Sequence, residues 1–110
     1  METIHVTEVL DKLTHGKAIE YDSVIIEGNL NVNDLNLPKD KEKSLIAIES
    51  LIKITNSRIV GRIRFPFSIF KMEIDFSGST FSEYADFSGS TFNRDANFRD
   101  STFTTFNNSS

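Results

Sequence analysis

The chain of 110 residues contains no cysteine and no tryptophan, and it has only two prolines and two tyrosines. Without cysteine, neither a disulfide nor a thiolate metal site can stabilise the fold. No window approaches the roughly 18 apolar residues of a membrane span, and the first residues, METIHVTEVLDK, lack the basic and apolar regions of a signal peptide. We therefore expect a soluble, cytoplasmic protein.

Groups that perform catalysis or bind metals are also scarce. His5 and His15 lie ten residues apart in the N-terminal segment, without carboxylates at a metal-ligand spacing, so we expect them to cap a helix or face solvent. Serines are numerous and regular, but no base is positioned to activate one. No glycine-rich phosphate loop is present. We expect no enzyme activity, no catalytic residue, no cofactor and no bound metal.

The net charge of −4 is unevenly distributed. Residues 1–47 carry nine acidic and five basic side chains, whereas residues 48–110 carry seven of each. The second half of the chain is therefore electrically neutral, which disfavours nucleic acid as a partner.

Large apolar residues recur with strict regularity from residue 54 to residue 103. All ten phenylalanines lie between Phe65 and Phe106, and the recurrent positions alternate between spacings of five and six residues. Neither an α-helix, with its period of 3.6, nor a flat strand, with its period of 2, produces this pattern. A fixed repeat of one five-residue and one six-residue unit indicates a solenoid, in which each unit buries its apolar side against its neighbours.

The flanking segments suggest how the solenoid begins and ends. Apolar residues at helical spacing over 6–15, followed by Gly16, predict one short helix with Thr7 as its N-cap. We assign residues 1–22 to a capping helix and lead-in, residues 23–106 to the solenoid, and residues 107–110 to a tail. The charged stretch at 37–44, which contains Pro38, predicts a loop inserted in the first coil.

Individual units carry a family resemblance. The segments GNLNV, NDLNL, ADFSG, STFNR and ANFRD resemble the pentapeptide-repeat family, with a small residue, Asp or Asn, a central Leu or Phe, and two polar residues. The resemblance implies a right-handed quadrilateral β-helix, mainly β, with one unit on each of four faces. Alternate units here have six residues, so one coil takes twenty-two positions and a corner in each pair must bulge.

Stacking at this coil length of twenty-two positions predicts a ladder of fourteen buried side chains in four columns. The first column holds Ile25, Ile54, Phe76 and Phe98; the second holds Leu30, Ile59, Phe81 and Phe103; the third holds Leu35, Phe65 and Phe87; the fourth holds Ile48, Phe70 and Phe92. At about 4.8 Å per coil the rod would be short, on the order of 17 Å.

Three functions remain compatible with this pattern. The first is a non-enzymatic scaffold that presents a flat, rigid surface to another protein. The second, which the family resemblance implies for some members, is a mimic of duplex DNA that regulates type II topoisomerase, but this rod is short and its repeats are neutral. The third is an ice-binding solenoid, for which Thr80 and Thr102 offer only a short ladder. The resemblance also implies a possible homodimer through the C-terminal coil. We expect no membrane partner.

Overall fold

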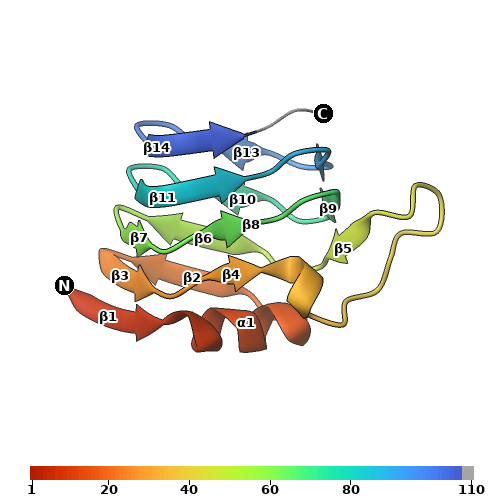
Figure 1. Ribbon diagram of the computed structural model, residues 1–110, viewed down its shortest axis with the longest axis horizontal. Helices are drawn as coiled ribbons and strands as arrows, with labels where there is room; N and C mark the ends of the chain where they lie inside the picture. Colours follow the sequence, from red (N-terminus) through yellow and green to blue (C-terminus); the bar gives the residue numbers. More distant parts are fainter. Residues whose placement is uncertain (108–110) are drawn as a thin grey trace.

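The computed structural model describes the backbone of residues 1–107 and the side chains of residues 1–104. The chain winds into a stack of coils with a single short helix at its N-terminal end (Figure 1). All pairings between its strands are parallel, as far as the described residues show. The predicted fold class, a mainly β solenoid with a short N-terminal helix, is confirmed.

Each coil contributes strands to four sides of the stack, which we call faces 1 to 4 in chain order. Face 1 contains β2 (Ile19–Asp22), β6 (Ile52–Thr55), β10 (Ile74–Asp75) and β13 (Ala96–Asn97). Face 2 contains β1 (Glu2–His5), β3 (Val24–Glu27), β7 (Arg58–Val60) and the first parts of β11 (Thr80–Asp86) and β14 (Thr102–Asn107).

The last two faces complete the coil. Face 3 contains β4 (Leu30–Asn31), β8 (Ile63–Arg64) and the second parts of β11 and β14. Face 4 contains β5 (Ile46–Ile48), β9 (Ser68–Phe70) and β12 (Thr91–Phe92). Because β11 and β14 run around the corner between faces 2 and 3, these two faces form one sheet. Their register shifts between Phe81 and Tyr84, which places a bulge at that corner.

The register fixes how far apart stacked residues lie in the sequence. Ile59 pairs with Phe81 and Phe81 with Phe103, which is the predicted separation of one coil in both cases. The first coil is longer: Ile26 pairs with Ile59, thirty-three positions later, which exceeds the regular coil of twenty-two by half a coil length. A short 3-10 helix, η1 (Val32–Asp34), and the segment after it add the extra residues between faces 3 and 4.

This longer first coil corrects three predicted ladder positions. Ile25 pairs with Arg58 and is only half-buried, whereas Ile26 occupies the inward position. Leu30 is buried but pairs with Ile63, so it does not lie over Ile59. Leu35 is the half-buried C-cap residue of η1 and lies outside the ladder. The prediction failed because it confined the insertion to the charged loop at 37–44.

The other eleven predicted ladder residues lie at inward positions. Eight are buried, and three in the last coil are partly buried; the eight are Ile48, Ile54, Ile59, Phe65, Phe70, Phe76, Phe81 and Phe87, and the three are Phe92, Phe98 and Phe103. In each column one phenylalanine ring stacks on another, with centroids 5.6 Å apart for Phe65–Phe87, 5.0 Å for Phe70–Phe92, 5.6 Å for Phe76–Phe98 and 4.6 Å for Phe81–Phe103.

The solenoid begins earlier than residue 23. β1 pairs with β3, and β2 pairs with β6, so both strands of the expected lead-in belong to the stack. The short alternating patterns ETIH and IEYD do not show the five-residue repeat, which is why the sequence did not reveal them. The predicted tail at 107–110 lies, after Asn107, outside the described residues.

The helix α1 (Val6–Thr14) closes the N-terminal end of the stack, between β1 on face 2 and β2 on face 1. Val6, Val9 and Leu13 are buried against the core because they recur at helical spacing on one side. His5, and not Thr7, is the N-cap: its ring Nδ1 accepts the backbone N–H of Thr7 at 3.2 Å. The helix therefore covers the apolar residues of the first coil, as a solenoid cap must.

Candidate functional site

Buried serines hold successive coils together. The hydroxyl of Ser79 donates to the carbonyl of Ile54 at 2.8 Å and accepts the backbone N–H of Ser57 at 3.1 Å. Ser90 makes the same pair of bonds, to the carbonyl of Phe65 at 2.6 Å and from the N–H of Ser68 at 3.0 Å. Since each hydroxyl both donates and accepts within the backbone ladder, these serines stabilise the fold and offer no activated nucleophile.

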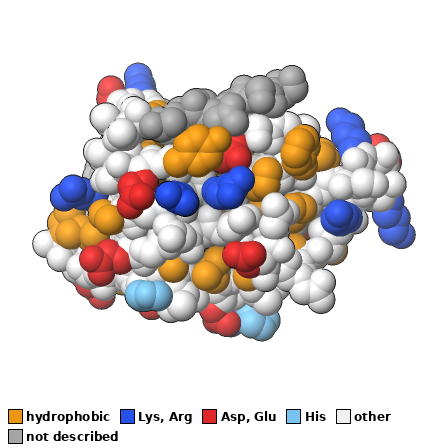
Figure 2. All heavy atoms as spheres, viewed as in Figure 1, with side chains coloured by type: hydrophobic (Ala, Val, Ile, Leu, Met, Phe, Trp, Pro, Cys, Tyr) orange, Lys and Arg blue, Asp and Glu red, His pale blue; other side chains and the backbone are white. Residues whose placement is uncertain are grey.

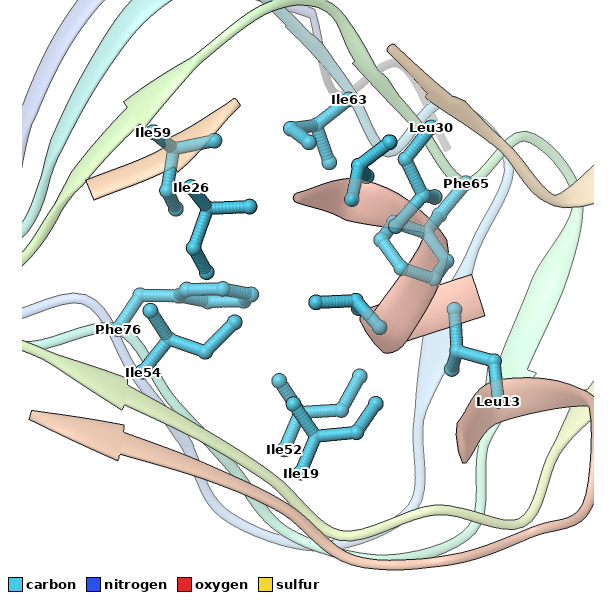
Figure 3. A pocket seen from close by; sticks show the side chains of 12 residues that line it. Leu13, Ile19, Ile26, Leu30, Ile52, Ile54, Ile59, Ile63, Phe65 and Phe76 are labelled. Carbon is cyan, nitrogen blue, oxygen red and sulfur yellow. The ribbon is translucent and has the colours of Figure 1, made fainter. Parts of the chain in front are cut away.

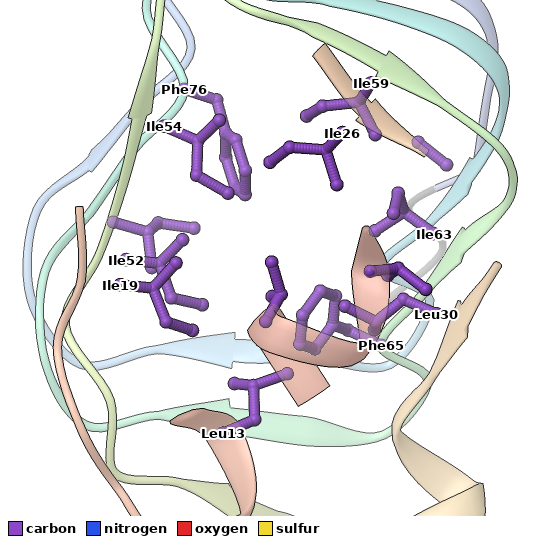
Figure 4. Packing of buried hydrophobic residues seen from close by; sticks show 14 of the residues in the cluster. Leu13, Ile19, Ile26, Leu30, Ile52, Ile54, Ile59, Ile63, Phe65 and Phe76 are labelled. Atoms are coloured by element: carbon purple, nitrogen blue, oxygen red, sulfur yellow. The ribbon is translucent and has the colours of Figure 1, made fainter. Parts of the chain in front are cut away.

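The interior leaves one small apolar space beneath the helix. Isoleucines of the first two coils, together with Phe65, Phe76 and helix residues, point into it from all sides (Figure 3). It leaves about 20 Å³ for the centre of a water-sized sphere. The same side chains form the core cluster (Figure 4). Because no polar group lines it, this space stays dry and offers no reaction chemistry.

The two histidines serve the helix ends. His5 caps the N-terminus, and His15 is the C-cap residue, with its Nδ1 2.8 Å from the carbonyl of Asp11. Within residues 1–104, no group of three or more His, Asp or Glu side chains is placed to hold a metal. Over the same described part, no helix is long and apolar enough to cross a membrane.

A polar cluster ties the helix to face 1. The Tyr21 hydroxyl donates to the Glu8 carboxylate, and the Lys12 ammonium donates to the Tyr21 oxygen at 3.0 Å. Lys12 also lies over the Tyr21 ring, 4.6 Å from its centroid. Burial, followed by the bond to Glu8, raises the pKa of Tyr21, and the bond to Tyr21 raises the pKa of Lys12. Tyr21, which occupies the first-coil position below Ile54, was not predicted from the sequence.

Polar residues line the outer side of face 1. Glu20, Lys53, Asp75 and Asn97 follow one another up the stack. At the neighbouring corner Asp22 accepts the Thr55 hydroxyl at 2.7 Å and the Asn56 amide at 3.0 Å. These hydrogen bonds, that of Thr55 first, lower the pKa of the Asp22 carboxyl. Face 1 is therefore a mixed-charge surface whose hydrogen bonds connect the first two coils.

Face 2 carries the threonine pair considered for ice binding. Thr80 pairs with Thr102, and Arg58 lies below Thr80. Ile25 precedes Arg58 in the same outward column. The threonine ladder therefore has two members and is interrupted, so the structure shows no extended threonine array on this face within residues 1–104.

Face 3 joins two charged residues across neighbouring coils. Arg64 pairs in register with Asp86, and its Nε lies 3.9 Å from Oδ2 of that carboxylate, which is nearly buried. Oδ1 of Asp86 also accepts the backbone N–H of Ser88 at 2.9 Å and so shapes the corner. Figure 2 shows positive and negative side chains close together across this side of the molecule. Such mixed charge gives the face little field of its own.

Face 4 is bordered by the inserted loop. Lys39 forms an isolated antiparallel bridge with Ile46, and the carbonyl of Pro38 accepts the N–H of Ala47 at 2.9 Å. The loop then projects from the body of the stack beside β5 (Figure 1). A groove lies between residues 38–43 and the outer side of the face, where Ala47 and Ile69 are buried. The insertion in the first coil therefore forms one side of a groove on face 4.

Phe67 forms the corner between faces 3 and 4, with 62% of its surface exposed. Its φ of 48° lies in the left-handed region, which costs a bulky residue about 1–2 kcal/mol. The other non-glycine residues with positive φ are Ser23, Ser44, Asn56 and Asp100, which are small or polar. Sequence reasoning missed this residue, because in RFPFSIF it falls between two inward-facing phenylalanines.

Comparison with known proteins gives one finding. Residues 65–109 match the family described as pentapeptide repeats (9 copies). No curated protein and no solved structure matches the chain. The parallel register extends the same coil geometry through the strands that precede the matched residues.

Proposed function

We propose, since residues 65–109 match the pentapeptide repeats, that the protein is a non-enzymatic scaffold that presents a flat, rigid surface for protein–protein interaction. The supporting observation is that the repeated residues stabilise the interior of the stack: aromatic columns fill the core, and serine hydroxyls join the coils. What remains available to a partner is the pattern of side chains on the four outer faces.

Rigidity supports this role. On each face the strands of the inner coils pair with the coils on both sides, so an outward side chain there is held in place by a backbone fixed on both sides. A partner that binds such a surface does not have to order a loop, which lowers the entropic cost of association. The extents of 40 × 26 × 22 Å give room for a standard interface of about 800 Å² per partner.

The proposal is tested by immobilising the chain and quantifying what it captures from an extract of its source organism. Four variants run in parallel, each altering one face at an exposed position: Lys53→Glu on face 1, Thr80→Arg on face 2, Arg62→Glu at the border of face 3, and Lys71→Glu at the border of face 4. A scaffold should lose a specific protein in one of the four and retain it in the others. Equal retention by all four would refute a face-specific interaction.

Charge separates this role from mimicry of duplex DNA. Duplex DNA over 26 Å, the extent of the molecule along the stack of coils (Figure 1), would carry roughly 15 phosphate charges, whereas the whole chain has a net charge of −4. Arg58, Arg62 and Arg64 also lie on the second coil, where a mimic would need acids. We expect no inhibition in a topoisomerase supercoiling assay, and inhibition at low protein concentration would support the mimic instead.

We also propose a second copy of this chain as a partner of the last coil. Phe92, Phe98 and Phe103 are only partly buried there, although their columns are buried one coil earlier. β12 and β13 each pair on one side only within the described residues. Joining two such ends would bury the rings and reduce exposed strand edges. Sedimentation velocity should show a dimer that Phe98→Asp converts to monomer; a monomer throughout would contradict the proposal.

A further inference from the structure

The four faces differ in what they offer a partner. Faces 1 and 3 present mixed charge, and face 2 presents hydroxyl groups around Arg58. Face 4 alone has a groove walled by an insertion, over Ala47 and Ile69. Of the three large hydrophobic residues that the described chain exposes, Phe67 lies directly before strand β9 of this face and Met72 lies two residues after it.

The conformation of Phe67 is not explained by the stability of the fold. One coil later the same corner is occupied by Gly89, which suits the left-handed backbone there. A Cβ on Gly89 would come 2.4 Å from Cδ1 of Phe67, so the ring lies directly against that glycine. An aromatic side chain at a strained and exposed position is a recognised sign of function.

Hydrogen bonds on both sides fix the backbone that carries the Phe67 ring. The backbone N–H of Phe67 donates to the carbonyl of Ser88 at 2.8 Å, and its carbonyl accepts the N–H of Ile46 at 2.9 Å. Pro66, which precedes it, fixes one more backbone angle. An exposed aromatic residue on a rigid corner is the kind of anchor that dominates protein interfaces, because little conformational entropy is lost when it enters a pocket.

The charge around the groove indicates the chemistry of the partner. Lys39, Lys41, Lys43 and Lys71 line it, against Asp40, Glu42 and Glu49. Within residues 1–104 none of these lysines makes an ion pair or a side-chain hydrogen bond. Oδ1 of Asp40, by contrast, is occupied by the backbone N–H groups of Glu42 and Lys43. With Glu42 and Glu49 counted, the groove has four lysines against three carboxylates, a small local excess of positive charge in a chain of net charge −4.

We propose that this groove and Phe67 together bind an acidic, extended segment of a partner protein. The inference rests on the scaffold function and identifies face 4 as its binding face. Phe67 packs against apolar side chains of that segment, and the lysines of the 37–44 loop and Lys71 contact its carboxylates. A membrane surface is a poorer match, since one phenylalanine beside a nearly balanced loop lacks the apolar area that stable anchoring needs. Nucleic acid, with a charge on every phosphate, is a poorer match for a groove whose lysines barely outnumber its carboxylates.

The test uses fluorescence anisotropy with a labelled peptide in which glutamates flank a pair of leucines. We expect the full chain to bind it, and Phe67→Gly to weaken binding by about tenfold or more, as loss of an interface anchor does. Thermal unfolding of Phe67→Gly should occur near the wild-type temperature, because relief of strain offsets the added freedom of glycine. Unchanged binding, or a large loss of thermal stability, would overturn the role of Phe67.

Charge is tested separately. Lys41→Gln combined with Lys43→Gln should weaken binding and reduce its salt dependence, whereas the matched control, Lys17→Gln with Lys53→Gln, removes two exposed lysines outside the groove and should bind normally. Equal effects of the two pairs would contradict a specific groove. Failure of the peptide to bind, or tighter binding of phosphatidylserine vesicles or single-stranded DNA, would overturn the proposed partner.

The four-face capture experiment separates this inference from the broader proposal. If Lys53→Glu, Thr80→Arg or Arg62→Glu abolishes capture while Lys71→Glu does not, the scaffold function stands and the assignment to face 4 is wrong. If no face variant alters capture, the scaffold function itself fails.

Discussion

The core should be most sensitive to loss of the Phe87 ring. This side chain is fully buried, and its ring centroid lies within 6.4 Å of five other phenylalanine rings. Truncation of a buried phenylalanine to alanine costs about 3–5 kcal/mol, through lost transfer energy and the cavity left behind. Because parallel coils on either side limit collapse into that cavity, we expect Phe87→Ala to lower the free energy of unfolding by about 4 kcal/mol, the middle of this range.

Urea denaturation monitored by circular dichroism measures this loss. With a slope of about 2 kcal/mol per molar urea, a loss of about 4 kcal/mol lowers the unfolding midpoint by about 2 M. Phe98→Ala is the matched control, since its ring stacks in the next coil but is only partly buried, and it should cost about half as much. A loss below about 1 kcal/mol for Phe87→Ala would refute the buried aromatic ladder.

Further changes test the polar parts of the fold. Ser79→Ala leaves two buried backbone groups without their partner and should cost about 1–3 kcal/mol in urea unfolding; a neutral result would contradict its bridging role. Gly61→Ala places a Cβ 2.1 Å from a backbone oxygen at a φ of 125° and should lower Tm, and an unchanged Tm would contradict this close approach. Tyr21→Phe removes the hydroxyl that ties the helix to face 1, so amide hydrogen exchange in α1 should accelerate; unchanged exchange would show that the tie is unimportant. Because hydrogen bonds in the folded state lower the pKa of Asp22, its ionised carboxylate contributes its full stabilisation above the ordinary pKa of 3.8, and this stabilisation disappears as the pH falls through the folded pKa. Asp22→Asn should therefore make the free energy of unfolding fall less steeply at acidic pH. An unchanged dependence of that free energy on pH would contradict this role of Asp22.

The repeat pattern made the second half of the solenoid predictable. From Ile48 onward, the constant coil length places every predicted ladder residue in its column, because each unit repeats the same small and aromatic positions. The first coil was less accessible. In SVIIEG three apolar residues adjoin, so the pattern did not decide between Ile25 and Ile26, and a one-residue shift reverses which side chains point inward.

The candidate binding face was even less visible in the sequence. In the sequence, Phe67 is one more member of an aromatic series, and the charged residues at 37–44 indicate only a surface loop. Only the fold shows that Phe67 is exposed at a strained corner and that the loop forms one side of a groove on face 4. Neither property has a local signal, because both depend on which residues the coils bring together.

By itself, the sequence determined that the repeats form a solenoid, because alternating intervals of five and six residues fit neither a helix nor a flat strand. The resemblance to the pentapeptide-repeat family implied the four sides, and the rings stacked four units apart agree with that geometry. The tertiary structure decided how far the stack extends toward the N-terminus, through β1 and β2, and where the long first coil closes, with Ile26 beneath Ile59. The reason is that periodicity fixes the contacts between regular units, whereas the position of an irregular segment is fixed by backbone hydrogen bonds to coils distant in the sequence.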